Sequence, residues 1–278
     1  ETGEVEYPPQ GFSVMGMEGS ALVYLQAGLA YRALPGLSLG ASLGVMAGSF
    51  QAELLTYVAD PGSMGPPESE QYVRPASFAM RNVIRPTGSL GVLADLGALF
   101  GGGGGDGAWV LGASFALPVS LEGTGRFEID LPDSGLYADA ELSGDEVEVA
   151  MAFPWVARVG LRHRVLEELQ AELSFTYEAW SMQDAIEVSS DIRITNVPVL
   201  DTFTVGDLRM ERNLQDTWAL GLGAEYALNP ELQLRGATWY ESSSMSDATM
   251  SPLTPDTEKA GLALGAAVSL ERWLDGLW

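Results

Sequence analysis

The sequence predicts an all-β fold, an antiparallel transmembrane β-barrel of the kind that crosses bacterial outer membranes. Apolar residues recur at every second position in about nine segments, so each segment, if extended, has one apolar and one polar face. The connections between these segments alternate between short and long, as they do at the two rims of a bacterial barrel. No run of 18 apolar residues occurs, which excludes a transmembrane helix.

Composition narrows the classes of function. The chain has 278 residues, with 14 Lys and Arg against 38 Asp and Glu, for a formal net charge of −24. Such a charge repels nucleic acid, so no nucleic-acid partner is expected. The chain has no cysteine, and its one histidine is His163, which argues against disulfides, metal sites and a Ser-His-Asp triad. We therefore expect no metal, no cofactor and no enzymatic activity.

Nine segments are expected to be strands. The alternation is clearest near residue 170, where odd-numbered residues from Leu169 to Tyr177 are apolar and even-numbered residues from Gln170 to Glu178 are polar. The expected strands are residues 20–34, 37–57, 87–100, 107–130, 145–165, 168–193, 215–228, 231–244 and 259–273.

The connections fall into two classes. Tight turns are expected at residues 34–36, 101–106, 166–168 and 229–230, where Pro, Gly or Asn in three of the four supplies the backbone geometry of a turn. Long polar loops are expected at about 58–86, 131–144, 194–214 and 245–258. Short turns on one rim and long loops on the other place the short rim on the periplasmic side.

Each strand can be assigned an outward and an inward face. In the seventh strand Trp218 and Tyr226 share the apolar face, eight residues apart. That spacing corresponds to about 19 Å along the barrel axis, so the two rings could lie near the two membrane interfaces. Small residues, among them Gly40, Ser42 and Gly44, dominate the opposite face of the second strand and leave space inside.

The fifth strand carries the clearest charge pattern. Glu146, Glu148, Arg158, Arg162 and Arg164 share one parity and are expected to line the interior, because charges on the lipid face are costly. Residues of the other parity, from Val147 through Val149, Phe153 and Trp155 to Leu161, are expected to face outward. Pro154 removes a ladder donor and should mark a bulge or kink.

A charge network is expected in the lumen. Arg158 and Arg162 could pair across it with Glu172, Glu178 or Glu225. A structural network of ion pairs is the favoured role, and contact with a carboxylate of a ligand is the alternative.

Two of the expected loops contain apolar residues that could collect a hydrophobic solute. They include Tyr72, Phe78, Met80 and Ile84 in residues 58–86 and Phe203 in residues 194–214. Arg81 and Arg85 could bind the carboxylate of a fatty acid. The alternative is that the apolar residues pack on the barrel rim, and this is slightly favoured.

An ordered series of segments resembles the FadL/toluene-transporter family of outer-membrane channels for hydrophobic compounds. The series begins with Phe153-Pro154-Trp155-Val156 and Arg158-Val159-Gly160. Tyr177-Glu178-Ala179-Trp180-Ser181 comes next, followed by Asp216-Thr217-Trp218-Ala219-Leu220 and by Gly221 to Tyr226. The series ends with Tyr240-Glu241-Ser242-Ser243 and Pro255-Asp256-Thr257-Glu258-Lys259. The resemblance extends from about residue 20 to the end of the chain.

The resemblance implies a barrel of 14 strands plugged by an N-terminal hatch, with passive entry through extracellular loops and exit through a lateral opening at a kinked strand. This chain shows about nine strands and neither the hatch nor its Asn-Pro-Ala element. Residues 1–278 are therefore expected to be a partial barrel, whose partners would include the missing strands or hatch.

The function expected from this resemblance is passive transport of long-chain fatty acids or aromatic hydrocarbons across the bacterial outer membrane, with outer-membrane lipid and a hydrophobic ligand as partners. A general diffusion porin or structural barrel is the first alternative and predicts a water-filled lumen without a hydrophobic ligand. A soluble all-β binding domain is the second, and an enzyme is the most distant.

Overall fold

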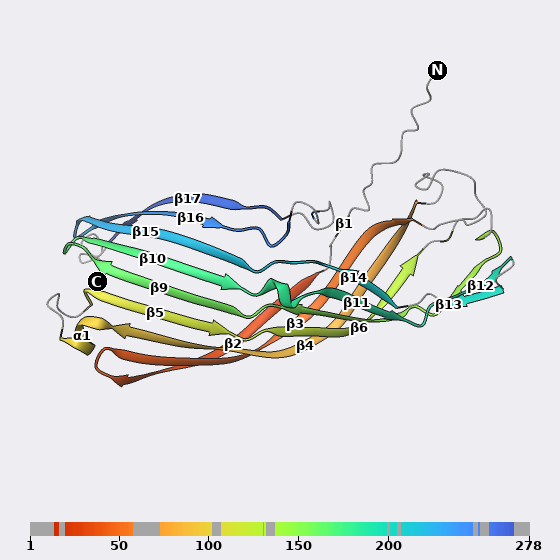
Figure 1. Cartoon of the computed structure of the whole chain (residues 1–278), viewed down its shortest axis with the longest axis horizontal. Coiled ribbons are helices and arrows are strands. Elements are labelled where there is room, and N and C mark those ends of the chain that lie inside the picture. Colours follow the sequence, from red (N-terminus) through yellow and green to blue (C-terminus); the bar gives the residue numbers. More distant parts are fainter. Residues whose placement is uncertain are drawn as a thin grey trace, which may run out of the picture.

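The computed structural model describes residues 14–16, 20–57, 73–101, 107–129, 131, 137–198, 201–204, 207–246, 250 and 256–269. Most of them belong to one antiparallel sheet (Figure 1). No helix in these ranges is long and apolar enough to cross a membrane.

Nine strands lie side by side and form what we call the main wall. In spatial order they are β2 (Ala21–Leu34), β3 (Leu37–Tyr57), β4 (Val73–Asp95), β5 (Trp109–Ala116), β9 (Val156–Arg164), β10 (Leu169–Glu178), β15 (Thr217–Asn229), β16 (Leu232–Glu241) and β17 (Lys259–Val268). They correspond in order to the nine expected segments. A short strand, β1 (Val14–Gly16), pairs with the far end of β3.

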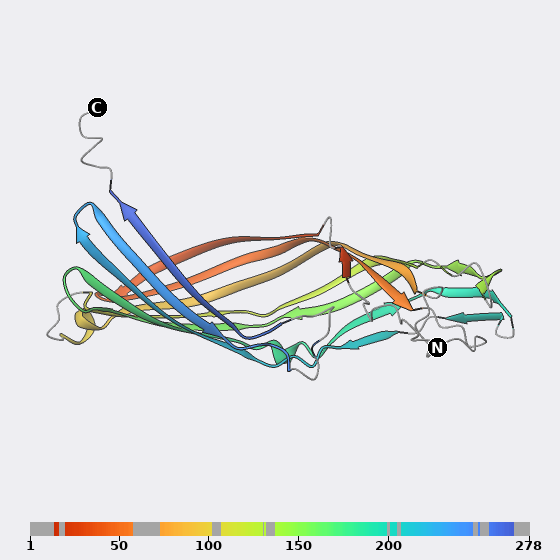
Figure 2. The same ribbon diagram turned by 90° about the horizontal axis from the view of Figure 1, so that it is seen from above.

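The main wall is curved and, over the described residues, open. Figure 2 shows the curvature from above. Strands β2 and β17 form its two edges and do not pair with each other in the part of the chain that the structure describes. The predicted antiparallel sheet of barrel type is confirmed, but the described strands do not close into a barrel.

Four strands continue the sheet beyond the main wall and form what we call the extension. They are β6 (Val119–Ile129), β8 (Glu146–Phe153), β11 (Ala185–Ser190) and β14 (Leu208–Glu211). Strand β4 joins the two parts, because its residues 89–95 pair with β5 and its residues 76–80 pair with β6. A separate small sheet contains β7 (Glu141–Ser143), β12 (Arg193–Val197) and β13 (Asp201–Thr204).

The structure corrects several expected boundaries. Residues 73–86 are not loop but the first half of β4, in which Pro75, Pro86 and a bulge between Met80 and Val83 obscure the alternation. Segments 107–130 and 145–165 are each two strands that meet at a bend, β5 with β6 and β8 with β9. Segment 168–193 contains β10, a short 3₁₀ helix at Trp180–Met182 and β11. The expected loops 131–144 and 194–214 contain the short strands β7 and β12 to β14.

The tight turns lie together at one end of the main wall (Figure 1). Gly36 has φ of +85° between β2 and β3, a conformation that favours glycine. The Asn229 side chain accepts hydrogen bonds from the backbone N–H groups of Glu231 and Leu232, both at 2.9 Å, and so closes the turn between β15 and β16. After β4, the helix α1 (Leu96–Phe100) is capped by Asp95, which also accepts a hydrogen bond from the Gly107 N–H.

Candidate functional site

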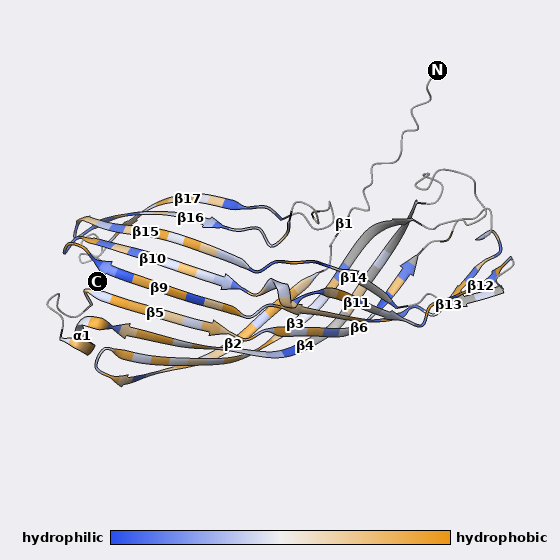
Figure 3. Cartoon of the chain, viewed as in Figure 1, coloured by the Kyte–Doolittle hydropathy of each residue, from blue (hydrophilic) through white to orange (hydrophobic). Residues whose placement is uncertain are grey.

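One face of the main wall is apolar and exposed. Leu29, Leu43, Leu262 and Leu264 are between 73% and 87% exposed although they stand in the middle of strands. Apolar and polar positions alternate along these strands (Figure 3). Such a continuous apolar surface is unfavourable in water and is expected where a barrel faces lipid. We call this the outer face.

A row of aromatic rings crosses the outer face at the end away from the tight turns. Phe115 stacks on Trp155 with ring centroids 5.4 Å apart, and Trp155 lies 5.3 Å from Tyr177. Tyr177 is paired in register with Trp218, whose ring lies 5.2 Å from Tyr240. Aromatic rows of this kind are typical of a membrane interface.

The outer face also carries aromatic residues near the tight turns. Trp109 and His163 are stacked with centroids 3.7 Å apart, and the ring Nδ1 of His163 lies 3.0 Å from the carbonyl oxygen of Ala108. Tyr226, on β15, is 44% exposed. The single histidine therefore belongs to the outer surface and not to the lumen.

The opposite, inner face of the main wall consists largely of small and polar residues. Cross-strand rows bring together Gly40, Gly91 and Ser114, and likewise Ser42 and Ser89, whose hydroxyl oxygens lie 2.7 Å apart. The first row borders a hollow of about 540 Å³ that also includes Arg158, and the two serines border a hollow of about 500 Å³. Small side chains thus leave open space along the inside of the wall, as expected from the sequence.

Of the charged residues expected in the lumen, Arg158, Arg162, Arg164, Glu172, Glu178 and Glu225 lie on this inner face. The prediction is wrong for Glu146 and Glu148, which lie on the other face of β8. The ion pairs of the structure are also different from the expected ones. Glu225 pairs with Arg235 at 2.8 Å, and Glu178 accepts a hydrogen bond from the Trp180 indole N–H at 2.8 Å. Arg158, Arg162 and Glu172 are exposed and form no ion pair among the residues described. Sequence reasoning missed Arg235, which lies next to Glu225 in the β15–β16 register.

In the extension the polarity of the two faces is reversed. Its inner face carries a buried apolar cluster: Met80, Val119, Leu121, Val147, Val149 and Ile192, none more than 5% exposed. Met46 lies on the inner face of β3 and packs against this cluster. The cluster is therefore on the same side of the sheet as the inner face of the main wall. The other face of β6 and β8 carries exposed charges, among them Glu122, Arg126, Glu146 and Glu148.

The reversal occurs where two neighbouring strands bend at proline. Between β5 and β6 the chain passes through Leu117 and Pro118, and between β8 and β9 it passes through Pro154 and Trp155. The bends are adjacent, because Ala116 pairs with Val156 and Val119 pairs with Phe153.

This bend overturns the expected faces of the fifth strand. The kink at Pro154 was predicted, but the assignment of Val147, Val149 and Phe153 to the same face as Trp155 is wrong. Val147 and Val149 lie in the inner cluster, whereas Trp155 stacks on Phe115 on the outer face. Proline cannot donate to the ladder, and the irregular residues around it shift the alternation by one.

The wall is interrupted between β4 and β6. Pairing with β4 stops at Ser89–Ala116 on one side and at Met80–Gly125 on the other. Between these limits one backbone hydrogen bond remains, from the Leu117 N–H to the Gly88 carbonyl oxygen at 2.9 Å. Arg85 crosses this interruption: its guanidinium donates to the carbonyl oxygens of Ser120 at 3.0 Å and Glu122 at 2.7 Å, and pairs with the Glu122 carboxylate at 3.2 Å. The Arg85 side chain thus supplies most of the described contacts between β4 and β6 across this interruption.

The residues expected to collect ligand do not form one site. Met80 is fully buried in the inner cluster, Ile84 is 63% exposed, and Arg85 crosses the interruption. Phe78 and Arg81 lie in β4 and Phe203 lies in β13, but the structure describes none of their side chains. Tyr72 lies outside the described residues.

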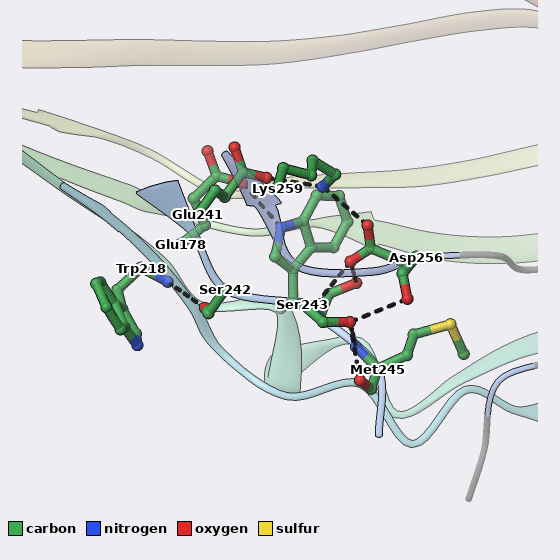
Figure 4. A network of polar contacts seen from close by, with 10 residues as sticks. Glu178, Trp218, Glu241, Ser242, Ser243, Met245, Asp256 and Lys259 are labelled. Atoms are coloured by element: carbon green, nitrogen blue, oxygen red, sulfur yellow. Dashed lines mark hydrogen bonds and ion pairs between the residues drawn. The ribbon is translucent and has the colours of Figure 1, made fainter. Parts of the chain in front are cut away.

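A polar network fixes the connection between β16 and β17 at the rim away from the tight turns (Figure 4). Lys259 pairs with Glu241 at 2.9 Å and with Asp256 at 2.8 Å. Asp256 accepts hydrogen bonds from the backbone N–H and hydroxyl of Ser244, at 2.6 and 2.7 Å. Partial burial raises the pKa of Asp256, but the bonds from Lys259 and Ser244 outweigh this effect and lower it to about 2. The described residues contain no group of three or more side chains suited to a metal ion.

Comparisons with known proteins agree with this architecture. Residues 108–274 match the family described as outer membrane protein transport protein (OMPP1/FadL/TodX). No curated protein sequence matches the chain.

Solved structures with a similar fold include proteins from three bacteria. A FadL homologue from Pseudomonas aeruginosa superimposes with a TM-score of 0.64 and 18% identity, over 88% of this chain and 55% of that protein. The toluene transporter TodX from Pseudomonas putida gives 0.59 and 18%, over 91% and 62%. The toluene transporter TbuX from Ralstonia pickettii gives 0.52 and 16%, over 90% and 69%. The chain thus spans 55% and 62% of the first two of these structures.

Proposed function

Because this chain belongs to the outer membrane transport protein family OMPP1/FadL/TodX, we propose that it forms much of the wall of a passive channel for hydrophobic compounds, such as long-chain fatty acids or aromatic hydrocarbons. The family is one of bacterial outer-membrane proteins. Two structurally similar proteins are toluene transporters, which makes aromatic hydrocarbons a reasonable substrate class.

The reversal of polarity at Pro118 and Pro154 is the observation that supports this proposal best. A hydrophobic solute needs an apolar surface before it enters a polar lumen, and the half-buried residues Phe127, Met151 and Phe153, which pack against the cluster on the inner face of the extension, provide one. A general diffusion porin has no need of a buried apolar cluster on its inner side, so this observation favours the hydrophobic channel over the porin.

The interruption between β4 and β6 supports a lateral exit. A wall held here by the Arg85 side chain and one backbone hydrogen bond can open at lower cost than a continuous sheet. The interruption starts next to Ala116, which follows Phe115 of the aromatic row, so it would open near a membrane interface. We assign Arg85 to this gate and not to fatty-acid binding.

Edges β2 and β17 need further strands before lipid can surround the wall, because unpaired backbone groups are costly in a bilayer. The channel therefore includes strands beyond the described sheet, and uptake has to be measured on the full-length protein in its outer membrane.

Uptake by outer-membrane vesicles tests the proposal. Vesicles containing the protein should take up radiolabelled toluene or palmitate faster than vesicles without it. Steady ion conductance without such uptake would replace the channel by a porin.

A crosslink tests the exit separately. Residues 1–278 contain no cysteine, so Arg85→Cys and Glu122→Cys place the one pair of thiols among them for a short bismaleimide. The crosslinked pair should lose uptake, whereas the same pair treated with a monofunctional maleimide should keep more of it. Full uptake after complete crosslinking would exclude the gate.

A further inference from the structure

Trp239 is an aromatic ring in an otherwise polar part of the lumen. It lies on the inner face of β16 and is 42% exposed. Among the residues of β9, β10 and β15 to β17, all of which the structure describes, it is the one aromatic residue of inner-face parity. The aromatic row on the outer face involves the neighbouring residue, Tyr240.

Glycine on the next strand holds the indole against the wall. Gly261 is paired with Trp239, and a Cβ atom at Gly261 would collide with the six-membered ring of the indole. On the other side Trp239 is paired with Gly221, where a Cβ atom would come within 2.6 Å of the Ser174 hydroxyl. The ring therefore lies over the Gly261 backbone on one side. On the side of Gly221 and Ser174 it borders an open space.

That space is a hollow of about 450 Å³, bounded by Trp239 and by side chains of β9, β10 and β15, among them Arg162, Glu172 and Ser174. Its other charges, Glu225 and Arg235, are paired with each other at 2.8 Å. Arg162 and Glu172 face each other in the β9–β10 register but form no ion pair within the described part of the chain. The hollow thus offers an aromatic surface, one unpaired donor group and one unpaired acceptor group.

We propose that this hollow is a binding site for a small aromatic ring that carries a hydroxyl group, that is, a phenol. The ring stacks on Trp239, while the hydroxyl accepts from Arg162 and donates to Glu172. A hydrocarbon would stack on Trp239 but could not bond to Arg162 or Glu172. An aromatic carboxylate would satisfy Arg162 but would be repelled by Glu172. The volume is large enough for a single substituted ring.

The inference rests on the proposed function, since the ligand reaches the hollow through the channel. It deepens that proposal by naming a substrate class. Uptake of p-cresol, toluene and benzoate by outer-membrane vesicles that contain the full-length protein tests the channel and the binding site separately.

Three substitutions test the contacts. Trp239→Ala should lower p-cresol uptake at low concentration about five- to ten-fold, and Trp239→Phe should restore most of it. Arg162→Met should lower p-cresol uptake to a similar extent and leave toluene uptake unchanged. Trp218→Phe, which changes a ring of the outer face, is the matched control and should have little effect on either compound. Heat-modifiable mobility on gels checks that each variant has folded.

The outcomes separate the two proposals. If the wild-type protein takes up none of the three compounds and no palmitate, the channel itself is refuted. If it takes up palmitate alone, the channel stands and the binding site for a phenol is refuted. If it takes up toluene and p-cresol but Trp239→Ala and Arg162→Met change neither, the binding site is refuted and the channel stands. If benzoate is taken up in preference to p-cresol, the phenol is the wrong ligand class.

Discussion

The main wall and the extension are built from neighbouring strands of one sheet, yet their polarity is opposite. In the main wall, leucine covers the outer face, while glycine, serine and charged residues line the inner face. In the extension, valine and leucine are buried inside and glutamate is exposed outside. The alternation of apolar and polar residues alone therefore does not determine which face of a sheet is the outer one. The medium around the sheet determines which residues its outer face carries. That medium changes from lipid to water at Pro118 and Pro154.

Removing the inner core of the extension should have the largest effect. Leu121 is 1% exposed in the buried cluster, so Leu121→Ala should lower the free energy of unfolding by about 2–5 kcal/mol. Denaturant unfolding in detergent would measure this change. Leu262→Ala, on the exposed outer face of β17, is the control and should cost much less in the same assay.

A charge placed on each outer face tests the comparison directly. Leu222→Arg puts a cation on the lipid-facing side of β15 and should destabilise the protein by about 2–4 kcal/mol if that position is near the bilayer midplane. Ser189→Arg, on the exposed face of β11 in the extension, should change stability by less than about 0.5 kcal/mol. Both changes in stability can be measured by refolding the variants into lipid vesicles. Equal effects of the two arginines would contradict the assignment of lipid to the outer face of the main wall and of water to that of the extension.

The aromatic row gives a smaller effect at the boundary between the two regions. Trp155 contacts both Phe115 and Tyr177, and each such contact contributes about 0.5–1.5 kcal/mol beyond burial. Trp155→Leu should therefore cost about 1–2 kcal/mol in refolding experiments, and the double variant with Phe115→Leu should cost less than the sum of the two. Strict additivity would show that the rings do not interact.

The rim network should give the smallest effect and a dependence on pH. The pKa of Asp256 is about 2 in the folded protein and 3.8 in its ordinary state, so the carboxylate stabilises the folded rim above pH 4. This contribution should disappear as the pH falls from about 4 to about 2. Because the pairs are partly exposed, it should amount to no more than about 1 kcal/mol.

Hydrogen exchange of the backbone near Ser244 would follow the change. Asp256→Asn is the control: it should exchange faster at neutral pH and show no further change between pH 4 and 2. A wild-type protein whose exchange is independent of pH in this window would contradict the role of the carboxylate.

Much of the main wall was predictable because apolar and polar residues alternate regularly along each of its strands. Strands such as β10 and β15 alternate without interruption, and Pro35, Gly36 and Asn229 mark their turns. The extension was not predictable in the same way. Val147 and Trp155 share a parity, and the sequence alone does not tell how many residues the bend at Pro154 takes out of the ladder. The Glu225–Arg235 pair and the contact of Trp239 with Gly261 depend on the register between strands, which a single sequence does not contain.

The paired bends also bear on how the sheet finds its register during assembly. In a uniformly alternating strand, a slip by two residues keeps every side chain on its proper face and is only weakly penalised. Here the same slip of β8 and β9 against β5 and β6 would separate Pro154 from Pro118. It would also carry residues of the charged outer face of the extension toward the lipid-facing band. The two prolines therefore favour one register of β8 and β9 against β5 and β6 and disfavour the registers shifted by two residues.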